Sequence, residues 1–185
     1  TGLIPFMVQY SYNYQHLKHT PTVLTIHNGQ YQGWFGCNKL HYIPDFDRSK
    51  LGFLEWNGAI NPLASAIKCT WKITTVSPSY LDEISNNANG LENLLRFERP
   101  KSVGILNGID TEVWNAATDP MLQKNYGLKD FKKGKAANKK WLCEQFNLDS
   151  KKPLFTFIGR LVGEKGAELL PQICSIAFNN NPQEI

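Results

Sequence analysis

The chain has 185 residues, of which 42% are hydrophobic and 19% are charged, and its formal net charge is +4. No segment approaches the ~18 consecutive apolar residues that a membrane-spanning helix requires, so we expect no membrane partner. Most of the excess positive charge lies between residues 132 and 152, without the aromatic interleaving or the motifs of a nucleic-acid site. A lysine-rich helix face in solvent is therefore favoured over nucleic-acid binding.

Apolar patterns predict alternating helices and strands in the first part of the chain. Helices are expected at residues 2–17, 62–71, 78–84 and 91–97, a buried strand at residues 22–26, and further strands at residues 72–76 and 102–106. Ser77 would cap the third helix, because it precedes a proline that suits a first helical turn. Residues 27–36 read as an aromatic, glycine-rich loop, and residues 37–58 follow neither period. Strands that alternate with helices predict an α/β fold with a parallel sheet.

The rest of the chain continues this order. We expect a tight turn at residues 107–110, helices at 116–125 and 131–146, and a strand at 153–158. The last of these, "PLFTFI", is an unbroken apolar run, which is typical of a strand buried on both faces of a parallel sheet. A final helix is expected to begin near Ala167, with Pro171 tolerated in its first turn.

The loop between that strand and that helix combines glycines with two cations. Gly159, Gly163 and Gly166 allow close backbone approach, and Arg160 and Lys165 can reach the same point. The spacing fits neither the phosphate loop G-x-x-x-x-G-K-[ST] nor the dinucleotide fingerprint G-x-G-x-x-G. An arginine fork with a mobile lysine charge suits a diphosphate, and a basic surface loop with turn glycines is the alternative.

Polar residues follow the ends of three predicted strands. His27 and Asn28 come after residues 22–26, Asn107 comes after residues 102–106, and Arg160 follows the last strand. Ligands of parallel sheets bind beyond the carboxyl ends of the strands, so these residues predict one composite site. Such a site would offer His and Asn to sugar hydroxyls and cations to phosphates. The alternatives are a hydrogen-bonded core histidine and a simple turn at Asn107.

The chain has four isolated cysteines, with no C-x-x-C pair: Cys37, Cys69, Cys143 and Cys174. The last three lie in helix-like apolar contexts, so we expect reduced, mostly buried thiols in a cytosol-like compartment. His16 and His19 could share a helix face, but no third ligand accompanies them, so no metal site is expected.

Five motifs in this order resemble the bacterial and plant glycogen and starch synthases: "IHNGQYQG", "TTVSPSY", "ILNGIDTEVWN" with "ATDP", "GKAANK" and "GRLVGEKG". This resemblance implies a retaining glucosyltransferase that uses ADP-glucose and has the GT-B fold of two Rossmann-like domains. It implies that residues 1–104 are the C-terminal part of the first, acceptor-side domain and residues 105–185 the start of the second, donor domain. Both domains would be incomplete, and the isolated chain would be inactive.

The resemblance also implies roles for particular residues. Arg160 and Lys165 match the pair that holds the donor diphosphate and stabilises negative charge as ADP departs. His27 and Asn28 match the pair that lines the glucose site, and Asn107 matches a residue that faces the same sugar at the domain crossover.

Other consequences of the resemblance concern substrates and compartment. Gly159 would let the backbone approach the donor, and Tyr31 and Trp34 would offer aromatic faces to an α-1,4-glucan acceptor, with core packing as the alternative. Family members need no metal or other cofactor. A bacterial cytoplasm is expected, or a plastid for a plant protein. A relative that uses another nucleotide sugar and a non-catalytic glucan-binding scaffold are the alternative functions.

Overall fold

The structure is a computed structural model that describes residues 2–180 and divides the chain into two compact units. Unit 1 is Thr1–Gly108 and unit 2 is Ile109–Ile185. The domain boundary predicted between residues 104 and 105 falls at the end of the last strand of unit 1. None of the helices in residues 2–180 has the length and apolarity needed to cross a membrane.

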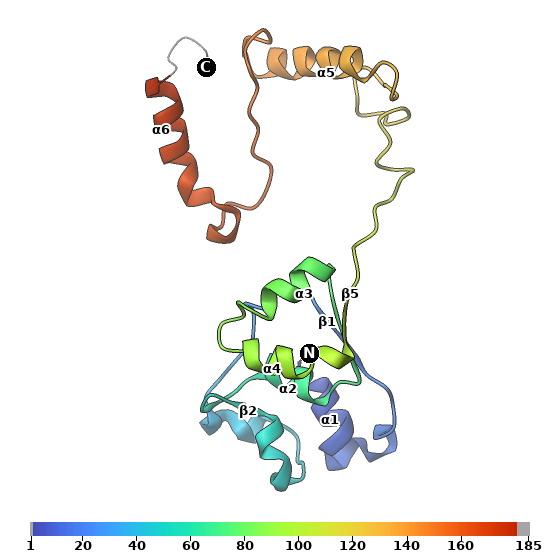
Figure 1. The fold of residues 1–185 in the computed structure, drawn as a ribbon, viewed down its shortest axis with the longest axis vertical. Helices are drawn as coiled ribbons and strands as arrows, with labels where there is room; N and C mark the ends of the chain where they lie inside the picture. Colours follow the sequence, from blue (N-terminus) through green and yellow to red (C-terminus); the bar gives the residue numbers. More distant parts are fainter. Residues whose placement is uncertain (1, 181–185) are drawn as a thin grey trace. The chain divides into compact units, whose positions relative to one another are not determined.

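Unit 1 alternates helices and strands (Figure 1). In chain order, with 3₁₀ helices written η, its elements are α1 (Ile4–Tyr10), η1 (Tyr12–Leu17), β1 (Val23–Ile26), η2 (Cys37–Tyr42), η3 (Arg48–Phe53), β2 (Glu55–Trp56), β3 (Ala59–Ile60), α2 (Pro62–Cys69), β4 (Lys72–Thr75), α3 (Pro78–Ile84), α4 (Glu92–Phe97), η4 (Arg99–Lys101) and β5 (Ser102–Gly104). The three predicted strands are confirmed as β1, β4 and β5, and the predicted helices as α2, α3 and α4.

The sheet of unit 1 is parallel and has the strand order β1-β4-β5. Leu24 pairs with Ile73 in one ladder, and Ile73 pairs with Ser102 in the other. The central strand is buried at Ile73, but β1 is not the buried strand that its apolar sequence predicts, because Val23 is 64% exposed. Within the described residues β1 is an edge strand, paired on one side only.

The predicted helix over residues 2–17 is wrong in its length. It breaks at Ser11, whose backbone is extended, and continues as the 3₁₀ helix η1. The buried Ser11 hydroxyl donates to the carbonyl of Asp45 at 2.9 Å and accepts from the Asn13 amide. A serine side chain that bonds nearby backbone competes with the helical ladder, which explains the break.

Residues 37–58 form η2, η3 and the first strand of a β-hairpin. The hairpin joins β2 to β3 through Asn57 and Gly58, which have φ angles of 51° and 78°. Two positive φ angles are required in this two-residue turn, and Asn-Gly is its preferred dipeptide. The Asn-Gly signal was therefore present in the sequence and identifies the hairpin.

Two clusters of buried apolar side chains form the core of unit 1. The first packs the sheet against α2, α3 and α4 and includes Ile67, Ile73, Leu91 and Leu95. The second packs α1 against the segment from η2 to β3. Its members are Phe6, Ile43, Phe46, Leu54, Ile60 and Cys69. The first cluster lies beneath the ends of the strands, where the candidate site is found.

Two contacts fix the start of α3. The Ser77 hydroxyl accepts a hydrogen bond from the Tyr80 amide at 2.9 Å, which confirms the predicted cap. Gly104, the last residue of β5, lies so close that an added Cβ would stand 2.3 Å from the Ser77 carbonyl oxygen. Only glycine allows this approach, so β5 and the helix start hold each other in place.

Unit 2 contains α5 (Phe131–Gln145), η5 (Gly163–Lys165), η6 (Ala167–Leu169) and α6 (Leu170–Asn180). The predicted helix at 131–146 is confirmed, and the final helix begins with a 3₁₀ turn at Ala167. The predicted helix at 116–125 is wrong, because that segment consists of turns. Asn115 and Asp119 accept backbone hydrogen bonds from residues two positions later, an alternative to the helical ladder.

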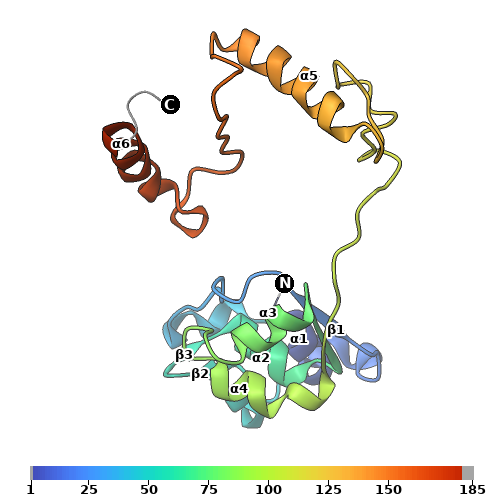
Figure 2. The ribbon, with the colours of Figure 1, turned by 45° about the horizontal axis from the view of Figure 1, so that its top comes forward.

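The predicted strand at residues 153–158 is also wrong. Figure 2 shows this segment as extended chain without a paired strand, and Ile158 is 94% exposed. A strand needs hydrogen bonds from a neighbour, and no described residue of unit 2 supplies one. Residues 107–110 form no regular structure, and a turn begins at Asp110, whose carboxylate accepts from the amides of Glu112 and Val113 at 3.0 Å.

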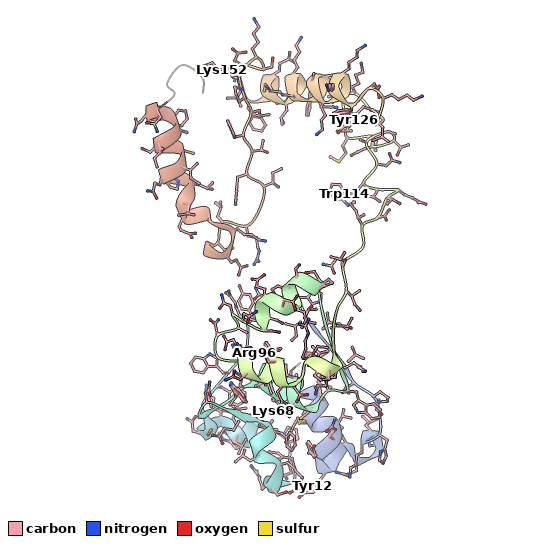
Figure 3. The ribbon with its side chains drawn as sticks, in the orientation of Figure 1. Tyr12, Lys68, Arg96, Trp114, Tyr126 and Lys152 are labelled. Carbon is pink, nitrogen blue, oxygen red and sulfur yellow. The ribbon has the colours of Figure 1, made fainter. Side chains whose placement is uncertain are left out.

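One close steric approach and two hydrogen bonds hold α5 to the preceding loop. An added Cβ on Gly134 would stand 2.3 Å from Tyr126, which Figure 3 labels beside the helix. The Asn138 amide group donates to the Lys124 carbonyl at 2.8 Å, and its oxygen accepts from the Lys124 amide. Gly134 and Asn138 both belong to the "GKAANK" motif, so in this unit the motif is structural.

Candidate active site

A pocket of about 220 Å³ opens at the carboxyl end of β1 in unit 1. Its wall combines the loop after β1 with α3 and the turn that follows α3. The lining residues are His27, Asn28, Gly29, Gln30, Tyr80, Glu83, Ile84 and Asn87. Polar side chains dominate this wall, which suits a ligand rich in hydroxyl groups.

Two hydrogen bonds shape the loop after β1. The Asn28 side-chain oxygen accepts from the Gln30 amide at 2.9 Å, and the Tyr80 hydroxyl accepts from the Gly29 amide at the same distance. The first bond closes a local turn, while the second ties the loop to α3. Because its oxygen already serves this turn, Asn28 would reach a ligand mainly through its amide NH₂ group.

His27 directly follows the buried Ile26 and is itself exposed in the pocket wall. An exposed ring is not the environment of a hydrogen-bonded core histidine, so that alternative does not hold in this structure. The strand places the imidazole at the sheet edge where ligands of parallel sheets bind.

A buried glutamine anchors the next part of the loop and was not recognised in the sequence. The Gln32 amide group donates to the carbonyls of Ala88 and Asn89, and its oxygen accepts from Asn61 at 2.7 Å. Asn61 in turn caps α2 through the amide of Ala64. A polar residue in a glycine-rich motif is the sequence signal for such an anchor, because a buried amide must find its partners within the fold.

The aromatic residues of the same loop face solvent. Tyr31 is 68% exposed and Trp34 is 70% exposed, so core packing is wrong for both rings. Rings held by an anchored loop can stack on flat apolar partners at little entropic cost.

The glycine loop of unit 2 brings one of its cations, Arg160, close to a carboxylate. The Arg160 guanidinium lies 2.7 Å from the Glu164 carboxylate, and the arginine side chain is 70% exposed. An exposed pair of this kind contributes only ~0–1 kcal/mol, so an incoming anion can replace it. Lys165 ends η5, and Gly166 follows with a φ of 70°, the left-handed conformation that glycine tolerates.

The predicted site residues fall into three groups in the structure. His27 and Asn28 line the pocket, and Tyr31 lies on the same loop. Gly159, Arg160 and Lys165 share the glycine loop of unit 2. Asn107 is exposed near the end of unit 1 and does not line the pocket.

The pocket also contains residues that sequence reasoning missed, namely Tyr80, Glu83 and Asn87. They come from α3 and the turn after it, far from His27 in sequence. Only the "TTVSPSY" motif, which includes Tyr80, marked this region.

The cysteines divide into two kinds. Cys69 and Cys143 are buried, whereas Cys37 and Cys174 are exposed, and all four are free thiols. Burial raises the pKa of Cys69 to about 12. The expected burial of Cys174 is wrong, because α6 has no buried residue. Between residues 2 and 180, no three His, Cys, Asp or Glu side chains are grouped as metal ligands.

Comparison with known proteins identifies relatives of the whole chain. The starch synthase catalytic domain family matches residues 1–97. Glycogen synthase of Flavobacterium johnsoniae is 57% identical over all of this chain, which spans 39% of that protein. Probable glycogen synthase 2 of Synechocystis is 37% identical, with 99% of this chain and 39% of the relative covered.

A solved structure agrees with these sequence matches. The catalytic domain of starch synthase IV from Arabidopsis thaliana, bound to ADP and acarbose, matches with a TM-score of 0.76 and 33% identity. The match covers 97% of this chain and 38% of that domain. The resemblance seen in the motifs and the predicted α/β, GT-B fold class are therefore confirmed. The chain belongs to the starch synthase catalytic domain family.

Proposed function

We propose that this chain forms part of a glucosyltransferase that moves glucose from ADP-glucose to the non-reducing end of an α-1,4-glucan. The observation that carries the proposal is the polar pocket with His27 and Asn28, found in a chain 57% identical to a glycogen synthase. The chain spans about 39% of the curated relatives that it matches most fully, so the activity is assigned to a polypeptide of their length.

In this proposal unit 1 binds the sugar. His27 and Asn28 hydrogen-bond hydroxyl groups of the glucose, and their loop is fixed in advance by Tyr80 and Gln32. A loop that is already ordered loses little entropy when the substrate binds. The exposed rings of Tyr31 and Trp34 stack on glucose units of the acceptor.

Unit 2 acts on the donor phosphates. Arg160 exchanges its contact with Glu164 for a phosphate oxygen, and Lys165 adds a second positive charge. Because the departing ADP gains negative charge, these cations stabilise the transition state more than the ground state. Gly159 allows the backbone to approach the diphosphate. Asn107 contacts the same glucose, the anomeric configuration is retained, and the reaction uses no metal.

The test is a chimera in which residues 1–185 replace the matching segment of the F. johnsoniae enzyme. We expect elongation of a labelled glucan with ADP-glucose and little transfer from UDP-glucose. His27→Ala in this chimera should lower turnover by about 10- to 100-fold, the loss expected for one strong hydrogen bond in the transition state. Its unfolding midpoint should stay near that of the parent, since His27 is exposed.

Three results would contradict the proposal. A folded chimera without transfer would favour a non-catalytic glucan-binding scaffold. Preference for another nucleotide would favour a relative with a different donor. A His27→Ala chimera that unfolds readily, with normal activity in the folded fraction, would mean that His27 stabilises the fold and does not bind the substrate. The 185 residues alone should give no elongation, because catalysis needs a closed site that these residues form only in part.

A further inference from the structure

One side chain of the pocket, Tyr80, holds the sugar-binding loop from a distant part of the sequence. The Tyr80 hydroxyl accepts the Gly29 amide at 2.9 Å, across 51 residues of sequence. Gly29 is a buried residue at the edge of the pocket, and this hydroxyl is the acceptor for its amide. Loss of the acceptor would leave a largely shielded backbone donor without its protein partner, which is unfavourable, so this bond fixes the position of the loop.

The other end of Tyr80 is equally well fixed. Its backbone amide is capped by the Ser77 hydroxyl, and its helix is anchored by the buried side chains of Leu81 and Ile84. The tyrosine ring packs against the first core cluster. A hydroxyl carried on such a rigid base sets the position of the loop, rather than following it.

The residues on either side of Gly29 give this contact its importance. Asn28 precedes Gly29, His27 precedes Asn28, and both line the pocket with Tyr80. The Asn28 side-chain oxygen accepts from the Gln30 amide, so a local hydrogen bond closes the turn around Gly29. A shift of Gly29 would therefore displace both predicted sugar-binding side chains.

We infer that Tyr80 is a positioning residue, which holds His27 and Asn28 in register with the substrate through the Gly29 amide. The inference rests on the proposed function for its catalytic consequence, but the structural contact can be tested without any activity. Displacing groups that act in the transition state lowers kcat more than it raises KM.

The first experiment measures amide hydrogen exchange by NMR in the 185-residue chain with Tyr80→Phe, which keeps the ring and removes the acceptor. We expect exchange at Gly29 to accelerate by about tenfold or more, while the amides of β1 and β4 keep their rates. The matched control is Tyr10→Phe. Tyr10 is also partly buried, but it packs in the second core cluster and stacks on Phe53.

The second experiment measures kinetics of the same variants in the chimera. Tyr80→Phe should lower kcat by about tenfold or more, with KM for ADP-glucose changed less than about threefold, and Tyr10→Phe should leave both unchanged. Unchanged Gly29 exchange would overturn the inference. So would a general rise in exchange over β1 and β4, which would mean a core role, or a rise in KM alone, which would mean direct substrate binding. An inactive parent chimera with selective Gly29 acceleration would reject the proposed function and retain the positioning contact.

Discussion

The two units reach their structures in different ways. Unit 1 buries two apolar clusters, with Phe6, Leu54 and Ile60 fully buried, and its sheet and helices follow from that burial. In the described part of unit 2, residues 109–180, only Gly134 and Cys143 are buried. That unit is held mainly by side chains that hydrogen-bond nearby backbone. The first kind of order is cooperative, and the second is local and weak.

The same contrast separates the residues proposed to bind the sugar from those proposed to bind the phosphates. The sugar-binding loop of unit 1 is fixed by contacts that span more than 50 residues of sequence, through Tyr80 and Gln32. The cations of unit 2 lie on a short loop, where the ion pair of Arg160 with Glu164 joins residues four apart. Unit 1 therefore contributes a preformed surface, whereas unit 2 contributes charges that a ligand can reorient.

The largest expected effect is on the core of unit 1. Phe6→Ala should lower the free energy of unfolding by about 3–5 kcal/mol, because the ring is fully buried and packs edge-on against Phe46. Phe155→Ala in unit 2 should change it by less than about 0.5 kcal/mol, since Phe155 is 81% exposed. Denaturant unfolding of the 185-residue chain measures both. Similar losses in the two variants would mean that unit 2 also has a cooperative core.

How much of this could be predicted from the sequence depends on whether a pattern is local. The period of the apolar residues predicted α2, β4 and α5, and the Ser77 cap needed only its own neighbours. The strand prediction for residues 153–158 was wrong, because a strand depends on hydrogen-bonding partners elsewhere in the fold. The helix prediction for residues 116–125 was wrong, because asparagine and aspartate side chains accept the backbone hydrogen bonds there in place of the helical ladder.

The site shows the same limit. His27 and Asn28 could be found, since the rule on strand ends is local once the strands are known. Glu83 and Asn87 could not, because folding alone brings α3 beside the loop after β1. Gln32 and Tyr80 belong to recognised motifs, but their hydrogen-bond partners lie far away in sequence, and no periodic pattern predicts such partners.

The second prediction separates activity from stability in unit 2. In the chimera, Arg160→Ala and Lys165→Ala should each lower kcat by about 100-fold or more, the scale of one lost charge contact in the transition state. Unfolding should change by less than about 0.5 kcal/mol, because the pair of Arg160 with Glu164 is exposed.

The matched control for these variants is Lys140→Ala. Lys140 also forms an exposed pair with a glutamate four residues later in unit 2, at 3.9 Å. It lies on α5, away from the glycine loop in sequence, so kcat should stay unchanged. Near-full turnover in both loop variants, or an equal loss in the control, would remove the assignment of the diphosphate to this loop.

The third prediction concerns the close approach of Gly134 to Tyr126 in unit 2. Glycine within a helix is normally replaced by alanine with a gain in stability of about 1 kcal/mol. At Gly134 the sign should reverse, with a loss of about 1–3 kcal/mol, because the new methyl would stand 2.3 Å from Tyr126. Gly52→Ala, in η3 of unit 1 with no atom within 4 Å of its added methyl, should be neutral or stabilising. Helical circular dichroism during thermal unfolding distinguishes them, and a stabilised Gly134→Ala chain would show that α5 is not held by this contact.

The smallest expected difference compares the buried thiols of the two units. Cys69 lies in the second core cluster, and burial raises its pKa from 9.0 to about 12. The folded thiol is therefore neutral at about pH 8, and we expect it to react with a thiol reagent only after unit 1 opens. Because the folded pKa lies above the unfolded one, this burial stabilises the chain fully below pH 9 and progressively less as the pH rises towards 12. Cys143 and Gly134 are the only buried residues among residues 109–180, so local opening of unit 2 should expose Cys143 earlier. With the exposed Cys37 and Cys174 changed to serine, a thiol reagent should modify Cys143 at least about tenfold faster than Cys69, a difference of about 1.4 kcal/mol in opening. Peptide mapping over time gives both rates. Equal rates would mean that the two units open together, and the contrast between a cooperative unit 1 and a locally held unit 2 would be wrong.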